Sequence, residues 1–150
     1  MTLTEAVIGL LVVAVAVGGA LQATTVARLE TIAADDRAVA RSLITALHTQ
    51  LSALRYRDPQ SAFTALGPDA GESTTGPAGW DDVDDAHGWT GMPTIVTATS
   101  DWSLAVSVTF ANAASPAVSA VTETGLKRIS VTARRGQRVI LTEEFLRATP

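Results

Sequence analysis

The chain contains no cysteine, so its redox compartment cannot be inferred from disulfides and zinc sites built on thiolates are excluded. Aromatic residues are few: three Phe, three Trp and one Tyr among 150 residues. A core must therefore be built mostly from Val, Leu, Ile and Ala, and it should be modest in size. The formal net charge of −4 argues against a nucleic-acid-binding protein, which needs a basic surface.

Basic residues are also missing from the start of the chain, where none precedes Arg28. The run from Ala6 to Leu21 has no charge and no polar side chain, and the uncharged stretch continues to Ala27. As a helix, these 22 residues would span about 30 Å, the thickness of the hydrocarbon layer of a membrane. A signal peptide would need a basic leading region, and a buried core helix should have a polar face. We therefore predict a transmembrane segment over residues 1–27, and we expect that a basic leader was removed before Met1.

Glu5 is a single carboxylate at the edge of this apolar run. A carboxylate in lipid or in an apolar bundle is costly unless it is paired, and this segment has no basic side chain. The local cation is the amine of Met1, which can reach Glu5 of a neighbouring chain that is offset by about one helical turn. Within one chain, Thr2-x-x-Glu5 also matches the capping-box pattern of a helix N-terminus. Pairing between subunits is the favoured interpretation, and capping can coexist with it.

The sequence Met1-Thr2-Leu3-Thr4-Glu5, followed by a run of Val, Leu, Ile, Ala and Gly, resembles the mature N-terminus of type IV pilins and type II secretion pseudopilins. The resemblance implies a prepilin peptidase that cuts before Met1 and methylates the new amine; Met1 stands where the family usually has Phe. It also implies that Met1 and Glu5 act in assembly. Subunits would wait in the inner membrane until an assembly platform builds them into a homo-oligomeric helical filament with the apolar helices as its core.

Beyond Gln22 the apolar residues recur every three, four or seven positions, which predicts an amphipathic helix over residues 28–56. Asp58-Pro59 should end it, so one helix is expected from about residue 2 to residue 54. Gly18-Gly19 is the weakest point, because each glycine costs about 1 kcal/mol in a helix interior. We expect both glycines to unwind or stretch once the subunit is packed. The apolar positions are Val26, Leu29, Ile32, Val39, Leu43, Leu47, Leu51 and Leu54.

Residues 57–93 form a connection rich in Gly and Pro, longer than ordinary loops. Within it, the string GWDDVDDAHGW (79–89) resembles a D-D-V-D-D-x-H-G-W signature in one subgroup of bacterial prepilin-like proteins, with Ala86 where that subgroup usually has an aromatic residue. Its carboxylates repel one another unless something compensates them. They belong to Asp81, Asp82, Asp84 and Asp85.

Three compensators are possible for these carboxylates: water and salt, a bound cation, or basic residues near the C-terminus. Hard oxygen ligands at close spacing suit Ca²⁺, although the spacing is not that of an EF-hand, and no other cofactor is expected. Alternatively, the cluster caps its own backbone through Asx-turns. The favoured interpretation is contact, within or between subunits, with basic residues near the C-terminus, because Arg can bridge two carboxylates at once. These residues are Lys127, Arg128, Arg134, Arg135 and Arg138.

The last part of the chain, residues 94–150, has a period of two and should form a sheet. Leu104–Phe110 and Lys127–Ala133 alternate, and Arg135-Gly136-Gln137 should turn the chain into a further strand from Val139 to Phe145. Thr94–Thr99 can add another strand. The sequence therefore predicts an α+β class with the pilin fold, in which the amphipathic half of the helix packs on three or four antiparallel strands. The globular head would comprise residues 28–150.

Two classes of function are compatible with a membrane-anchored head. The first is a structural subunit, a pilin of an extracellular type IV pilus-like filament; the alternative within this class is a pseudopilin or minor pilin of a type II secretion system or DNA-uptake machine, with a periplasmic pseudopilus. The second is a membrane-tethered enzyme, but the sequence has no P-loop, GxSxG or HExxH motif, so an enzyme is not expected.

Overall fold

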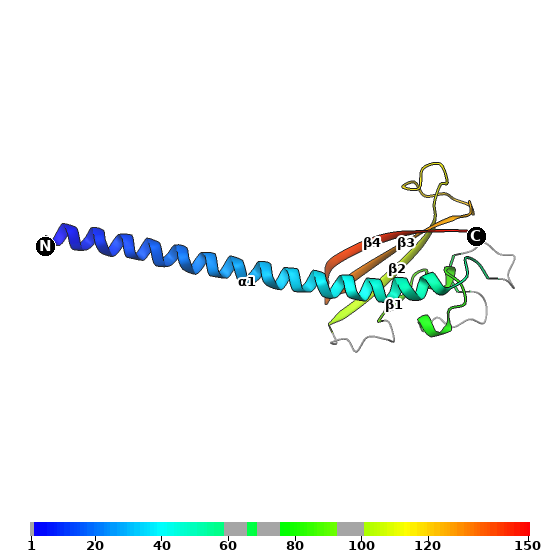
Figure 1. Ribbon diagram of the computed structural model, residues 1–150, viewed down its shortest axis with the longest axis horizontal. Helices are drawn as coiled ribbons and strands as arrows, with labels where there is room; N and C mark the ends of the chain where they lie inside the picture. Colours follow the sequence, from blue (N-terminus) through cyan, green and yellow to red (C-terminus); the bar gives the residue numbers. More distant parts are fainter. Residues whose placement is uncertain (1, 59–65, 69–75, 93–100) are drawn as a thin grey trace. The chain divides into compact units, whose positions relative to one another are not determined.

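The computed structural model describes residues 2–58, 66–68, 76–92 and 101–150. A single helix, α1, runs from Leu3 to Ala53, within one residue of the predicted bounds at each end (Figure 1). The chain forms two compact units, Met1–Arg37 and Ala38–Pro150, and α1 contributes to both. The domain boundary predicted between residues 27 and 28 stays a prediction about the assembled protein.

In the first unit, the described residues are helical from Leu3 onward, and their large apolar side chains are exposed on every face of the helix. Val26, Leu29 and Ile32 are more than half exposed, although the periodic pattern predicted them to face a core. In the chain by itself, the stripe of buried apolar residues begins only at Ala40, in the second unit. The predicted amphipathic helix therefore divides into an exposed part and a part that packs.

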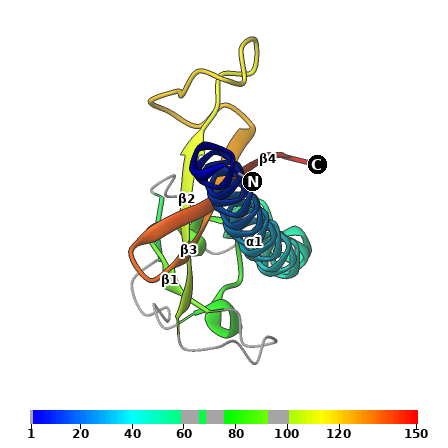
Figure 2. The same ribbon diagram turned by 90° about the vertical axis from the view of Figure 1, so that its left-hand side faces the viewer.

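The second unit contains a four-stranded antiparallel sheet in the order β1-β2-β3-β4 (Figure 2). Its strands are β1 (Thr90–Gly91), β2 (Trp102–Phe110), β3 (Leu126–Arg135) and β4 (Arg138–Ala148). Val106 of β2 pairs with Val131 of β3, and Arg135 pairs with Arg138 across the predicted hairpin turn. Gly136 in this turn has φ +57°, a conformation that favours glycine. The strand predicted over Thr94–Thr99 lies outside the described residues.

The core lies between the inner face of the sheet and the part of α1 that follows Ala38. Leu43, Ile44, Leu47 and Leu51 of α1 are buried, as the three- and four-residue spacing predicts. The strands bury every second residue of β2 and β3 against them. The buried strand residues of this cluster are Trp102, Leu104, Val106, Val108, Ile129, Val131 and Ala133. One long N-terminal helix and a four-stranded antiparallel sheet confirm the α+β prediction, and the arrangement matches a pilin-like fold.

Candidate functional site

The N-terminus of α1 is closed by a capping box. The backbone N–H of Thr2 donates to Glu5 Oε2 at 2.8 Å, and the backbone N–H of Glu5 donates to Thr2 Oγ1 at 3.4 Å. These two bonds satisfy N–H groups that have no partner within the helix. The capping interpretation of Glu5 is therefore confirmed. Met1 lies outside the described residues, so its methylation and its pairing with Glu5 of another copy stay predictions.

The helix continues without interruption through Gly18 and Gly19. A Cβ built on either glycine would have no atom within 4 Å, so nothing in the isolated chain requires glycine there. Just beyond them, the hydroxyls of Thr24 and Thr25 both donate to the carbonyl of Leu21 at 2.9 Å. The predicted unwinding concerns the packed subunit and stays a prediction.

By length and composition, α1 contains a segment that can cross a membrane, and in the chain by itself none of that segment is buried. No other element among the described residues has this character. The coarse prediction of a membrane-compatible N-terminal helix is therefore met.

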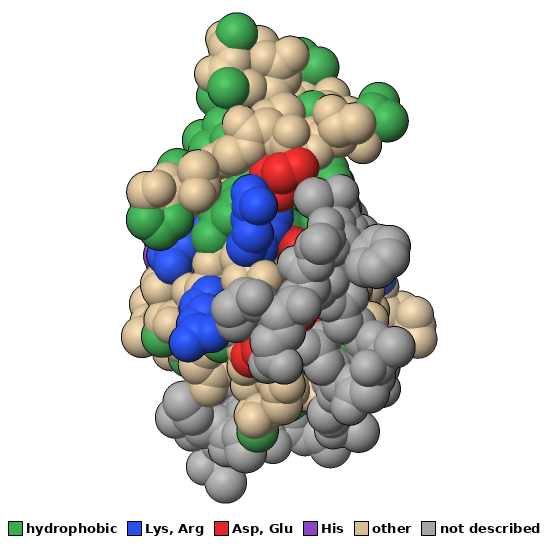
Figure 3. Space-filling model, turned by 90° about the vertical axis from the view of Figure 1, so that its right-hand side faces the viewer, with side chains coloured by type: hydrophobic (Ala, Val, Ile, Leu, Met, Phe, Trp, Pro, Cys, Tyr) green, Lys and Arg blue, Asp and Glu red, His purple; other side chains and the backbone are tan. Residues whose placement is uncertain are grey.

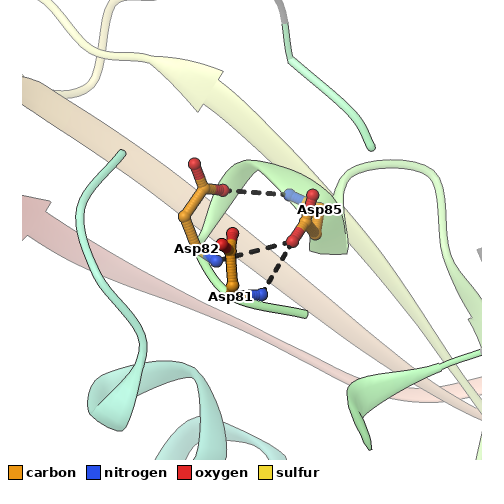
Figure 4. A group of neighbouring side chains, drawn as sticks. All are labelled: Asp81, Asp82 and Asp85. Atoms are coloured by element: carbon orange, nitrogen blue, oxygen red, sulfur yellow. Dashed lines mark hydrogen bonds between the residues drawn. The ribbon is translucent and has the colours of Figure 1, made fainter. Parts of the chain in front are cut away.

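In the second unit, the Asp-rich loop caps itself through two reciprocal carboxylates (Figure 4). Asp82 Oδ1 accepts from the backbone N–H groups of Asp84 at 2.6 Å and Asp85 at 3.3 Å. In return, Asp85 Oδ2 accepts from the N–H groups of Asp81 at 2.9 Å and Asp82 at 3.4 Å. These bonds fold the loop into a short 3-10 turn, η2 (Asp84–Ala86). The self-capping interpretation is confirmed.

Three of the four predicted metal ligands lie together. Asp81, Asp82 and Asp85 each offer an oxygen atom, and these atoms lie within 4.8 Å of one another. One oxygen each of Asp82 and Asp85 already accepts backbone hydrogen bonds, and the remaining carboxylate oxygens are of the kind that Ca²⁺ binds. The fourth predicted ligand, Asp84, is bonded to Lys127 instead. The loop is thus a self-capped turn, and the calcium site stays a prediction.

The basic residue that reaches the loop is Lys127 of β3, whose side chain is completely buried. Its Nζ donates to Asp84 Oδ2 at 2.8 Å and to the backbone carbonyl of Tyr56 at 2.5 Å. Glu123 Oε2 lies 3.9 Å from the same nitrogen. The Tyr56 ring centroid is 4.2 Å from it, a cation–π distance. We call Tyr56, Asp84, Glu123 and Lys127 the lysine node.

The contact between Lys127 and Asp84 confirms that a basic residue near the C-terminus reaches the Asp cluster, whereas Arg contacts between subunits stay a prediction. Arg128, the next residue, extends toward the opposite face of the sheet and donates to the carbonyl of Ala117 and to Ser119 Oγ, both at 2.7 Å. An ammonium group fits this enclosed position because its single nitrogen donates hydrogen bonds in three directions. The donors of a guanidinium group, in contrast, all lie in one plane. Apart from Lys127 the basic residues of the chain are all Arg, and Arg side chains lie beside acidic side chains at the surface of this end of the molecule (Figure 3).

The electrostatics of the loop follow from its burial. Burial, followed by the charge of Asp84, raises the pKa of Asp82 to about 6. Burial also raises the pKa of Asp84, although Lys127 opposes this through its hydrogen bond and its charge. For Glu123, burial acts to raise the pKa, but hydrogen bonds from Tyr56 and Gly125 together with the Lys127 charge lower it below its usual range. Glu123 is therefore ionised in the node, and its carboxylate carries no proton of its own.

Other residues of the string fix the loop to the core. Val83 and Ala86 are completely buried, and the Trp80 and Trp89 rings meet edge to face at 5.3 Å. His87 Nδ1 accepts from the backbone N–H of Val108 at 3.1 Å, so its ring continues the hydrogen bonding at the edge of β2. Ala86 is completely buried in the turn η2, although its side chain is only a methyl group.

Sequence reasoning missed two members of the lysine node. Tyr56 follows the end of α1, and its hydroxyl donates to Glu123 Oε1 at 2.6 Å; burial and this hydrogen bond raise the Tyr56 pKa. Glu123 lies in the connection between β2 and β3. Neither residue belongs to a motif, and the contacts span 67 to 71 residues of sequence. No local signal points to them.

Comparisons of the chain with models of protein families, with curated proteins and with solved structures return no match.

Proposed function

We propose that the chain is a pilin, the structural subunit of an extracellular type IV pilus-like filament that assembles through its N-terminal helix. The observation that carries the proposal is the all-round exposure of the apolar residues between Leu3 and Leu21, next to the single carboxylate of Glu5. Such a surface needs lipid or neighbouring helices to cover it. A membrane before assembly and a helical bundle after assembly would supply both.

The geometry at Glu5 is compatible with this proposal. One carboxylate oxygen accepts the Thr2 N–H, and an anionic carboxylate has further lone pairs that can accept the amine of another copy. An amine and a carboxylate that are both removed from water stabilise each other strongly, whereas one without the other is costly. Each incoming subunit would then find its axial position by pairing its amine with Glu5 of a copy already in place.

In this proposal, the subunit is cut and methylated at Met1 by a prepilin peptidase and lies in the inner membrane before an assembly platform extracts it. The second unit, with its sheet and lysine node, is the head on the filament surface. It has no enzymatic role and contacts no nucleic acid. The same features suit a pseudopilin or a minor pilin of a secretion system or DNA-uptake machine, in which case the filament stays in the periplasm.

The test is to express Glu5→Ala and Glu5→Gln in the native organism and to measure filament yield by electron microscopy with mass spectrometry of the subunit. Glu5→Ala should leave the monomer in the membrane but abolish filaments, and Glu5→Gln should recover only part of the yield because it loses the charge. Glu30→Gln, an exposed carboxyl further along α1, is the matched control and should assemble normally. Normal filament yield from Glu5→Ala would refute the pairing, and subunit found only in periplasmic structures would favour the pseudopilin alternative.

A further inference from the structure

The lysine node places an amine, a carboxyl group and a second carboxylate in contact inside the second unit. Lys127 Nζ is 2.8 Å from Asp84 Oδ2, and the Asp84 side chain is nine-tenths buried while that of Lys127 is fully buried. Asp84 Oδ1, the other oxygen of the same carboxyl group, has no hydrogen-bond partner among the described residues. Two opposite charges are thus held away from water, with one of them only half satisfied, which costs free energy.

The neighbours of this pair orient it and keep water out. The carbonyl of Tyr56 holds one N–H of Lys127, and the Tyr56 ring covers the ammonium at 4.2 Å. Glu123 approaches the same nitrogen with Oε2 at 3.9 Å, while its Oε1 is fixed by the Tyr56 hydroxyl at 2.6 Å and the Gly125 N–H at 2.8 Å. The amine of Lys127 is therefore held against the carboxyl group of Asp84, with Glu123 beside it, in a single fixed arrangement.

From this geometry we propose that Lys127 and Asp84 condense into an intramolecular amide bond after the chain has folded. Within the pair, a proton passes from the ammonium to the carboxylate, which gives a neutral amine and a neutral carboxylic acid. The nitrogen lone pair then attacks the carboxyl carbon of Asp84, and Glu123 accepts a proton from the nitrogen. Glu123 returns that proton to the departing hydroxyl group, so the C–N bond forms, one C–O bond breaks and one water molecule leaves.

This condensation needs no oxidant and no further reactant. It replaces two buried charges by one neutral amide, which removes the cost of keeping an ion pair in a dry site. The new bond would tie the turn η2 to β3 across 43 residues of sequence. It would link the loop that follows α1 to the sheet covalently, in a chain that has no cysteine to do so.

The test is the mass of the intact full-length chain, extracted in detergent and unfolded before measurement. After allowance for a methyl group on the Met1 amine, the chain should be lighter by one water molecule than its sequence requires. No Lys or Arg lies between Arg57 and Lys127, so trypsin should yield one peptide, 58–128, that lacks one water and is uncut after Lys127. Chymotryptic cleavage after Trp89 and Trp102 should release residues 90–102 and leave the piece that carries Asp84 joined to the piece that carries Lys127.

Glu123→Gln should restore the full mass and the cut after Lys127, because the amide side chain cannot accept the proton. Glu143→Gln, which removes an acid from the exposed pair with Arg41, is the matched control and should stay lighter by one water. A wild-type chain of full mass, a water loss located elsewhere, or an amide that still forms in Glu123→Gln would each overturn the proposal. Even if a variant fails to fold, the mass of the wild-type chain by itself shows whether the amide bond has formed.

Discussion

Replacing Asp82 by Asn should make the second unit more stable at neutral pH. The carboxylate of Asp82 is nearly buried, with 4% of the residue exposed, and its pKa is about 6 against an ordinary value of 3.8. An acid whose pKa is raised by folding contributes stability that is complete below its unfolded pKa and is lost as the pH rises through its folded pKa. The amide in Asp82→Asn would keep the carbonyl oxygen that accepts the N–H groups of Asp84 and Asp85, without the charge.

The difference between 3.8 and about 6 corresponds to about 3 kcal/mol, at about 1.4 kcal/mol per pH unit. The gap in free energy of unfolding between Asp82→Asn and the wild type should therefore shift in favour of Asn by about 2.5 kcal/mol from about pH 4 to about pH 7.5, because part of the effect is already present at pH 4. Urea unfolding followed by tryptophan fluorescence measures it, because all three Trp residues lie in the second unit. Using the difference cancels the titration of groups that the two proteins share.

Glu144→Gln, an exposed carboxyl on β4, is the control and should change stability by less than about 0.5 kcal/mol at either pH. The reasoning fails if Asp82→Asn is destabilised relative to the wild type as the pH rises. That outcome is what a bound cation or a paired carboxylate would produce, and a gain in wild-type stability on adding Ca²⁺ would then identify the cation.

Three further results are expected. Arg147→Met should lower the free energy of unfolding by about 1–3 kcal/mol, measured by urea unfolding, because Arg147 donates two hydrogen bonds to carbonyls at the end of α1. Gly91→Ala should lower the same quantity by about 1–3 kcal/mol, since a Cβ there would lie 2.6 Å from the Trp89 ring; an unchanged midpoint would show that the ring moves freely. Ala at both Gly18 and Gly19 should leave the helix content measured by circular dichroism unchanged or slightly higher but reduce filament yield, and undiminished assembly would refute the predicted unwinding.

The sequence by itself determined the long helix, the strands β2, β3 and β4, and the hairpin, whereas β1 lies in the stretch that was predicted to be a connection. Two local signals indicate the helix: the apolar spacing of Leu43, Leu47 and Leu51, and the Pro at position 59. Such signals are sufficient because the hydrogen bonds of a helix and the burial of one of its faces depend on residues close in sequence. The alternation in Leu104–Phe110 likewise selects the face of the sheet that is buried. The capping box at Thr2 and Glu5 and the self-capped Asp loop were also readable, because each is closed within a few residues.

Only the tertiary structure decided which distant side chains meet. Register between strands and the path of the loop bring Lys127 to Asp84, whereas Arg128, one residue later, points to the other face of the sheet because side chains alternate along a strand. In the same way, Arg147 closes the end of a helix that has no basic residue in its own last turn. Such contacts cross tens of residues of sequence, and neither periodicity nor composition records them, because both describe only neighbours along the chain.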